Sequence, residues 1–129
     1  MRNLLFVSLF LCLAVDPSAA QSLLVVTDRA PDEVVALWPD GAPGGRNVDV
    51  TEHFEQRAGP ADLPMQIVTD VTAPTLSIFR AREPDGSALL IVPGGGYSLI
   101  VVDHEGWESA RWFSRRGPTV YVMTYRLLY

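Results

Sequence analysis

Three consecutive glycines, Gly94 to Gly96, are the residues of this chain best suited to binding an anion. They follow a continuous apolar run, Ala88–Val92, after one proline. Glycine allows positive φ angles and close backbone approach, so successive backbone N–H groups can converge on one negative charge. Open α/β folds bind ligands at loops that leave the carboxyl ends of parallel strands. The candidate anions are a phosphate and the oxyanion of an acyl-transfer intermediate; alternatively, the glycines only connect a strand to a helix.

The spacing of these glycines does not match the fingerprint of proteins that bind the phosphates of a dinucleotide. The fingerprint Gly-x-Gly-x-x-Gly needs a third glycine where this chain has Leu99, and it should run directly into a helix. An acidic residue for the ribose should end the following strand, but Thr124 and Tyr125 stand there. We therefore expect no nucleotide cofactor.

The sequence lacks the other groups of an acyl-transfer site. A hydrolase of the α/β type needs a Gly-x-Ser-x-Gly turn, then an acid, then a histidine, and that serine motif does not occur here. Ser98 is the nearest match, but the closing glycine is missing, so we expect no triad member in the chain. Asp103 is expected to cap a helix, whereas His104 and Glu105 either line the site or lie in a solvated first helical turn.

Composition excludes several kinds of protein. The chain of 129 residues has no lysine, so a Walker A loop and a Schiff-base lysine are both excluded. A net charge of −5 without any basic run argues against a nucleic-acid partner. Cys12 is the single cysteine, and His53 and His104 are the two histidines, so we expect no disulfide framework and no metal site.

Apolar patterns and turn formers predict the elements that position the glycine loop. Asp103–Gly117 is the expected helix, with Gly117 in a left-handed conformation at its end and Pro118 preventing continuation. Val48–Pro64 is polar and is expected to be a surface loop. Strands are expected at Glu33–Trp38, Gln66–Val71, Thr75–Ala81, Ala88–Val92 and Thr119–Tyr125.

Residues 88–125 therefore follow the order strand, glycine-rich loop, helix, strand, which predicts a βαβ unit with two parallel strands. The continuous apolarity of Ala88–Val92 and Thr119–Tyr125 predicts strands covered on both faces, as in parallel sheets. We thus expect an α/β fold with a mostly parallel sheet. The turn Pro84–Gly86 leaves an alternative open, in which Thr75–Ala81 and Ala88–Val92 pair directly as a hairpin.

Several short motifs resemble, in this order, the amino-terminal part of secreted α/β-hydrolase esterases of the acetylxylan-esterase-like group. The resemblance covers Val34 to Leu127 and is carried mainly by the Pro-Gly-Gly-Gly-Tyr loop followed by Asp-His-Glu-Gly. The motifs are LWPDGAPG (37–44), TDVTAPTL (69–76), IVPGGGY (91–97), DHEG (103–106), ARW (110–112) and YRL (125–127).

The resemblance implies a partial α/β-hydrolase fold and a carboxylic-ester hydrolase that acts on acetyl esters of plant polysaccharide. It matches Pro93–Gly96 to the His-Gly-Gly-Gly loop of such enzymes, with Gly95, Gly96 and Tyr97 as the N–H donors of the oxyanion hole. The implied partner is a small-molecule or carbohydrate ester, and the implied site uses neither a cofactor nor a metal.

The resemblance also places Thr119–Tyr125 between Thr75–Ala81 and Ala88–Val92 in the sheet, against the hairpin alternative. A complete hydrolase core is longer than this chain. We therefore expect an amino-terminal fragment that supplies the oxyanion-hole loop but has no esterase activity alone. The alternative from another class is a secreted, non-catalytic α/β binding module.

The first twenty residues have the pattern of a secretory signal peptide. Arg2 precedes an apolar run, Leu4–Val15, and small residues Ser18–Ala20 precede the expected cleavage. The run is too short to span a bilayer, so we expect a secreted or periplasmic protein without membrane association after cleavage. The expected organisation is a signal peptide over 1–20, an extension with loops over 21–64, and a truncated hydrolase domain over 65–129.

Overall fold

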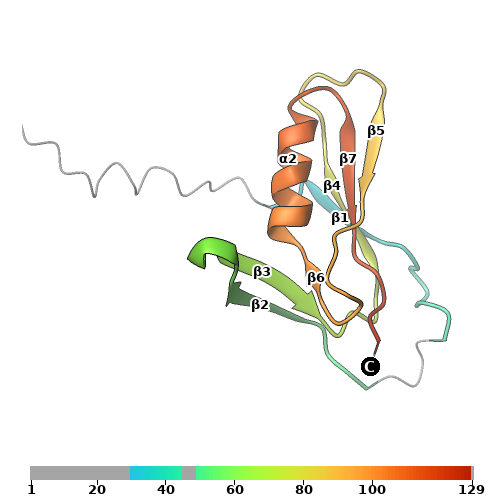
Figure 1. Cartoon of the computed structure of the whole chain (residues 1–129). Helices are drawn as coiled ribbons and strands as arrows, with labels where there is room; N and C mark the ends of the chain where they lie inside the picture. The colour runs from blue at the N-terminus through green and yellow to red at the C-terminus, as the bar shows by residue number, and fades with distance from the viewer. Residues whose placement is uncertain (1–29, 45–48, 129) are drawn as a thin grey trace, which may run out of the picture.

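A computed structural model describes residues 30–44 and 49–128, and within them seven strands form two sheets (Figure 1). The expected signal peptide, residues 1–20, lies outside the described residues. None of the helices in the described part is long and apolar enough to cross a bilayer.

The larger sheet has four strands in the order β1–β4–β7–β5. β1 pairs with β4, and β4 with β7, in antiparallel fashion, whereas β5 and β7 are parallel. The expectation that the strand near residue 120 lies between the other two is confirmed, and the hairpin alternative is wrong. The bounds are β1 (Glu33–Ala36), β4 (Thr75–Phe79), β5 (Ala88–Ile91) and β7 (Thr119–Met123).

The smaller sheet is antiparallel and has the order β2–β3–β6. Its strands are β2 (His53–Ala58), β3 (Pro64–Thr69) and β6 (Ile100–Val101), and the short 3₁₀ turn η2 (Pro60–Asp62) connects the first two. The expectation of a surface loop over Val48–Pro64 is wrong, because β2 pairs with β3 along its whole length. All residues of β2 are exposed, so backbone pairing forms this strand and no apolar pattern marks it.

The expected helix is present but begins irregularly. A π-helical segment, η3 (Asp103–Trp107), leads into the α-helix α2 (Glu108–Ser114). Gly117 has a φ of +123°, as its expected left-handed position requires. A Cβ atom there would lie 2.3 Å from a carboxylate oxygen of Asp85, so a larger residue would have to displace the Asp85 side chain and also adopt a positive φ.

The expected α/β fold with a mostly parallel sheet is wrong. Among the described strands, β5 and β7 form the one parallel pair, and the remaining pairs are antiparallel. The turn Pro84–Gly86 does reverse the chain after β4, but β7 inserts between β4 and β5. The helix returns the chain so that β7 runs parallel to β5 and therefore antiparallel to β4. The apolar content of a strand does not specify the direction in which it pairs.

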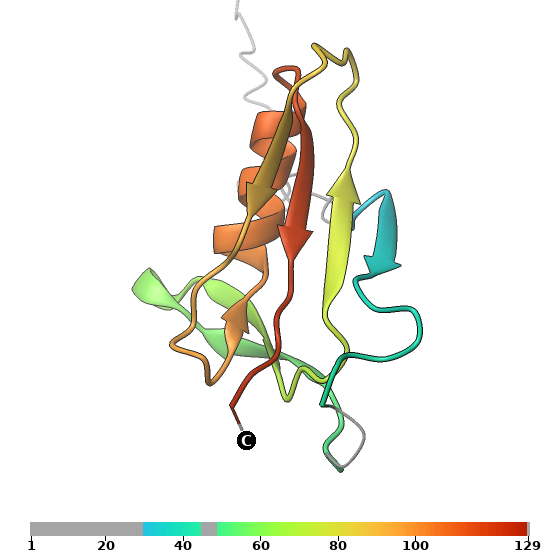
Figure 2. The same cartoon turned by 90° about the vertical axis from the view of Figure 1, so that its right-hand side faces the viewer.

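The helix α2 covers one face of the larger sheet, and the opposite face carries no helix (Figure 2). Beneath α2, Ala110 packs with Phe79, Val120 and Val122. On the opposite face, Leu90 is 55% exposed. The expectation that both faces of Ala88–Val92 are covered is therefore wrong for the described structure.

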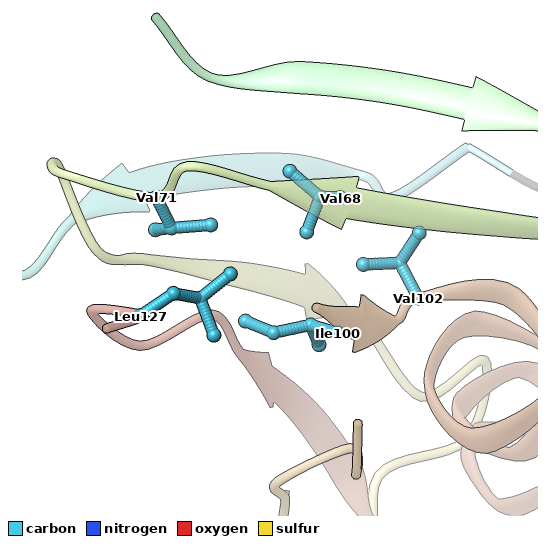
Figure 3. Packing of buried hydrophobic residues seen from close by; sticks show 5 residues of the cluster. All are labelled: Val68, Val71, Ile100, Val102 and Leu127. Atoms are coloured by element: carbon cyan, nitrogen blue, oxygen red, sulfur yellow. The ribbon is translucent and has the colours of Figure 1, made fainter. Parts of the chain in front are cut away.

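A second apolar cluster connects the two sheets to the end of the chain. It consists of Val68, Val71, Ile100, Val102 and Leu127, which point toward one another in Figure 3. Trp107 packs against this cluster and also against the one beneath α2. Because one side chain contacts both clusters, η3 is held between the two sheets, beside the loop that follows β5.

Candidate oxyanion-binding site

The glycine loop borders a groove where β5 and β7 end. The groove has a volume of about 550 Å³. Because β5 and β7 are parallel, their carboxyl ends lie at the same edge, where α/β folds commonly bind ligands. We call this the glycine-loop groove; its lining residues are Val92, Pro93, Gly94, Gly95, Gly96, Tyr97, Met123, Tyr125 and Arg126.

Three successive loop residues adopt positive φ angles, which turn the backbone sharply after β5. The angles are +147° at Gly95, +64° at Gly96 and +62° at Tyr97. The carbonyl oxygen of Gly95 accepts hydrogen bonds from the backbone N–H groups of Ser98 and Leu99 at 3.3 Å, which closes the turn. A non-glycine residue with positive φ is uncommon, so the conformation of Tyr97 is held by its surroundings.

The N–H groups of this loop differ in whether they have a partner. The N–H of Gly94 donates to Oε2 of Glu105 at 2.6 Å. Within the described part of the chain, the N–H groups of Gly95, Gly96 and Tyr97 donate to no protein acceptor. They are therefore not used in sheet pairing, and the residues that carry them line the groove.

Contacts on both sides of the loop hold it in this conformation. The Tyr125 hydroxyl donates to the carbonyl oxygen of Pro93 at 2.8 Å. The N–H of Val101 donates to the carbonyl oxygen of Gly94 at 3.0 Å. The N–H of Leu128 donates to the carbonyl oxygen of Tyr97 at 3.1 Å. Burial, and then the negative charge of the Glu105 carboxylate, raise the pKa of the Tyr125 phenol, which keeps this donor protonated.

Glu105 belongs to η3, and its carboxylate holds the first residue of the glycine loop. It was expected either to line the site or to lie in a solvated turn, and its side chain is exposed but hydrogen-bonded to the loop. A Cβ atom on Gly94 would lie 2.9 Å from the same carboxylate oxygen. The carboxylate thus fixes where the glycine loop begins relative to η3.

His104 lies away from the glycine-loop groove and does not line it. Its Nδ1 atom is 3.2 Å from Oε2 of Glu108. This hydrogen bond raises the pKa of His104, the charge of Asp103 adds to the rise, and partial burial opposes it. Of the two residues proposed to line the site, the structure brings only Glu105 to the glycine loop.

Asp103 was expected to cap the helix, and in the structure it also joins the helix to the smaller sheet. It is 1% exposed, and its Oδ2 accepts the backbone N–H of Gln66, in β3, at 2.6 Å. Its Oδ1 accepts the N–H of His104 at 2.7 Å, so one first-turn donor is satisfied as expected. Ser98 is exposed, and no hydrogen bond joins it to His104 among the described residues. Ser98, Asp103 and His104 therefore do not form a triad.

A distant segment forms a second wall beside the glycine-loop groove. A neighbouring cavity of about 320 Å³ shares Met123, Tyr125 and Arg126 with it and adds Trp38. The Arg126 guanidinium donates to the carbonyl oxygen of Pro43, which holds the two segments together. The motifs near residues 40, 95 and 125 are far apart in sequence and meet at this edge.

Sequence reasoning did not assign Met123, Tyr125 or Arg126 to the site. The available signal was their position directly at the carboxyl end of β7, because residues after neighbouring parallel strands share one edge. Trp38 had no comparable signal, since it lines the neighbouring cavity together with Met123 although the two residues are far apart in sequence. In the described residues, no group of three or more His, Cys, Asp or Glu side chains could hold a metal ion.

Comparison with curated proteins relates part of the chain to an acetylxylan esterase of Xylanibacter ruminicola. The two are 41% identical over 49 residues, which is 38% of this chain and 10% of the esterase. The chain therefore matches about a tenth of the length of this relative. No protein-family model matches the chain. No solved structure matches it. The similarity supports a relation of the matched stretch to esterases.

Proposed function

We propose that this chain supplies the oxyanion-binding part of a carboxylic-ester hydrolase site. The observation that carries the proposal is the row of N–H groups at Gly95, Gly96 and Tyr97, which have no described protein acceptor and border a groove. The partial similarity to an acetylxylan esterase supports ester hydrolysis over other chemistry that uses an anion site.

The chemistry follows from where charge develops during ester hydrolysis. Attack on the carbonyl carbon converts the carbonyl oxygen into an oxyanion, and backbone N–H groups fixed nearby stabilise that charge. One such donor is worth about 10²–10³ in rate in well-studied hydrolases. The donors here are held in advance by the bond from Gly94 to Glu105 and the turn closed at Gly95, so little reorganisation is needed.

The remaining catalytic groups are not among the residues that line the groove. These residues include no serine, cysteine or histidine, and the sequence has no Gly-x-Ser-x-Gly motif. On this proposal, a nucleophile, an acid and a histidine from outside the groove complete the site. We propose Gly95, Gly96 and Tyr97 as donors and Glu105 as the residue that positions them.

The substrate and location are part of the same proposal. An acetyl ester on a polysaccharide is the substrate class that the name of the relative supports. The signal-like pattern of residues 1–20 supports export, which would place the protein where extracellular polysaccharide is found.

The direct test is binding of an anion that resembles the tetrahedral intermediate. Methylphosphonate carries a methyl group and negative oxygens on a tetrahedral centre, and we would titrate it into the ¹⁵N-labelled chain. The amide resonances of Gly95, Gly96 and Tyr97 should shift saturably, and that of Gly94, already bonded to Glu105, should shift less. Unchanged resonances at all three donors would overturn the proposal.

Two variants test whether the shifts depend on the conformation of the glycine loop or would follow from any glycine substitution. Gly95→Ala should abolish the shifts because the loop cannot keep its conformation. Gly86→Ala, at a turn with open space around it, should preserve them. The chain alone should hydrolyse 4-nitrophenyl acetate no faster than buffer, and turnover that Ser98→Ala abolishes would contradict the assignment of roles.

A further inference from the structure

A second pocket lies at the opposite end of the larger sheet from the glycine-loop groove. It follows the carboxyl end of β4 and the last turn of α2, and its volume is about 360 Å³. Because β4 is antiparallel to β7, the end of β4 lies far from the groove where β7 ends. We call it the arginine pocket; its polar lining is Asp32, Arg80, Arg82, Arg111, Ser114 and Arg115.

The charge of this pocket is opposite to that of the whole chain. Four guanidinium groups line it in a protein whose formal net charge is −5. Among the described residues, Asp32 lines the pocket and pairs with Arg111, and Glu33 forms an ion pair with Arg80. Four guanidinium groups in one pocket repel one another, and a bound anion relieves that repulsion.

Part of the pocket is rigidly built. The Arg111 side chain is 18% exposed, and its guanidinium carbon lies 4.6 Å from the centre of the Phe79 ring. It donates to both carboxylate oxygens of Asp32, at 3.4 and 3.5 Å. Asp32 is fixed in turn, because its Oδ2 accepts the backbone N–H of Arg80 at 2.7 Å. Arg111 and the backbone of Arg80 thus hold defined positions before any ligand binds.

Arg82 supplies the uncommitted charge. Its side chain is exposed and lines the pocket, and it makes no hydrogen bond or ion pair with any described residue. A guanidinium group presents several donors in a fixed fork that matches the oxygens of phosphate and carboxylate groups. The arginines of the pocket come from two elements, the segment after β4 and α2, so their donors can contact a tetrahedral anion from different sides.

We propose that the arginine pocket binds a tetrahedral oxyanion, a phosphate or sulfate group, either free or carried as an ester on a larger molecule. This site does not depend on the proposed esterase function, because it shares no residue with the glycine-loop groove. Its volume leaves room for the atoms to which an ester group would be attached.

The test is a titration of the ¹⁵N-labelled chain with inorganic phosphate at low ionic strength. Saturable shifts are expected at the amides of Ala81, Arg82, Ser114 and Arg115. Arg82→Gln should weaken binding about tenfold, as the loss of one charge-assisted contact predicts. Arg57→Gln is the matched control, since Arg57 pairs with Glu55 on β2 and does not line the pocket.

The competing outcomes are distinguishable. Glucose 6-phosphate that binds more tightly than phosphate identifies the ester-linked group, and equal or weaker binding identifies the free ion; both support the site. Acetate that binds as tightly as phosphate would overturn the assignment to a tetrahedral anion. An equal effect of Arg57→Gln and Arg82→Gln, or shifts that never saturate, would show only diffuse charge attraction and would overturn the site itself.

Discussion

Gly95 and Gly96 are adjacent in the loop, yet they depend on glycine for different reasons. A Cβ atom on Gly95 would lie 1.9 Å from the carbonyl oxygen of Leu99, whereas one on Gly96 would meet no atom within 4 Å. Gly95 therefore needs glycine for space as well as for its φ of +147°, and Gly96 needs it only for its φ of +64°.

Substituting these two residues should separate the two requirements. We expect Gly95→Ala to lower the free energy of unfolding by roughly 3 kcal/mol, because a backbone clash adds to an unfavourable φ. Gly96→Ala should cost about 1 kcal/mol, the usual cost of a left-handed conformation for a residue with a Cβ. Urea denaturation measures both, and equal costs would contradict the close contact between Gly95 and Leu99.

His104 gives stability a defined dependence on pH. Its folded-state pKa is raised above the ordinary value of 6.5, first by the hydrogen bond to Glu108. Its contribution to the free energy of unfolding is therefore fully present below the pKa that His104 has in the unfolded state. This contribution is lost as the pH rises through the higher pKa of the folded state. We expect the free energy of unfolding to fall as pH rises above about 6.5.

The matched variant for this prediction is Glu108→Gln, which removes the charge of the partner. Denaturation midpoints should be recorded from pH 6 to pH 9 for both proteins. The fall in stability should be smaller in Glu108→Gln than in the original chain. Parallel profiles in the two proteins would mean that the pair of His104 and Glu108 does not contribute.

At the scale of elements, one buried carboxylate joins the smaller sheet to the start of the helix. Gln66 in β3 donates its N–H to Asp103 at 2.6 Å, and its carbonyl oxygen accepts the N–H of Val102 at 3.1 Å. This pairing continues the contact between β3 and β6 into η3. Because Glu105 of η3 holds the glycine loop, the same contacts position the candidate site.

Removing this carboxylate should destabilise the whole arrangement. We expect Asp103→Ala to lower the free energy of unfolding by roughly 3 kcal/mol, because two backbone donors lose a charged acceptor away from water. Asp40→Ala is the control, since Asp40 is exposed and should change stability by less than about 0.5 kcal/mol. Chemical denaturation distinguishes the two, and a neutral Asp103→Ala would contradict the structural role of the carboxylate.

At the scale of the whole molecule, α2 covers one face of the larger sheet, and no described element covers the other. Opposite α2, Leu90 and Val92 are more than half exposed, and Val35 is 40% exposed. Leu90 lies in β5 and Val35 in β1, which are the outer strands of that sheet, and Val92 directly follows β5. Exposed apolar surface at a sheet edge favours association with other apolar surfaces.

This surface should bind an apolar dye while the protein is folded. We expect fluorescence of 8-anilinonaphthalene-1-sulfonate to rise with the native chain, and Leu90→Thr to reduce it without lowering the melting temperature. Leu128→Thr is the control, because Leu128 is 80% exposed and lies outside the sheet. Equal effects of the two variants would mean that the sheet face does not bind the dye.

The local features of this protein follow from its sequence. The strands near residues 35, 77, 90 and 121 and the helix near 108 have apolar spacing or turn residues that predict them, and each is present. The glycine loop is equally local, since consecutive glycines after an apolar strand predict the sharp turn that the structure shows. These predictions succeed because periodicity, glycine and proline act over a few residues.

The parallel direction of β5 and β7 was expected from the βαβ order and is confirmed, but tertiary structure alone decided the antiparallel pairs, β2 and the surroundings of the loop. The β4 and β5 strands are separated by β7, which no local pattern records, and β2 is a polar strand formed by pairing with β3. Glu105 holds the glycine loop while His104 turns toward Glu108, although both residues share one helical turn. Such outcomes depend on contacts between residues far apart in sequence, and the apolarity of a segment does not encode which partner or direction it will take.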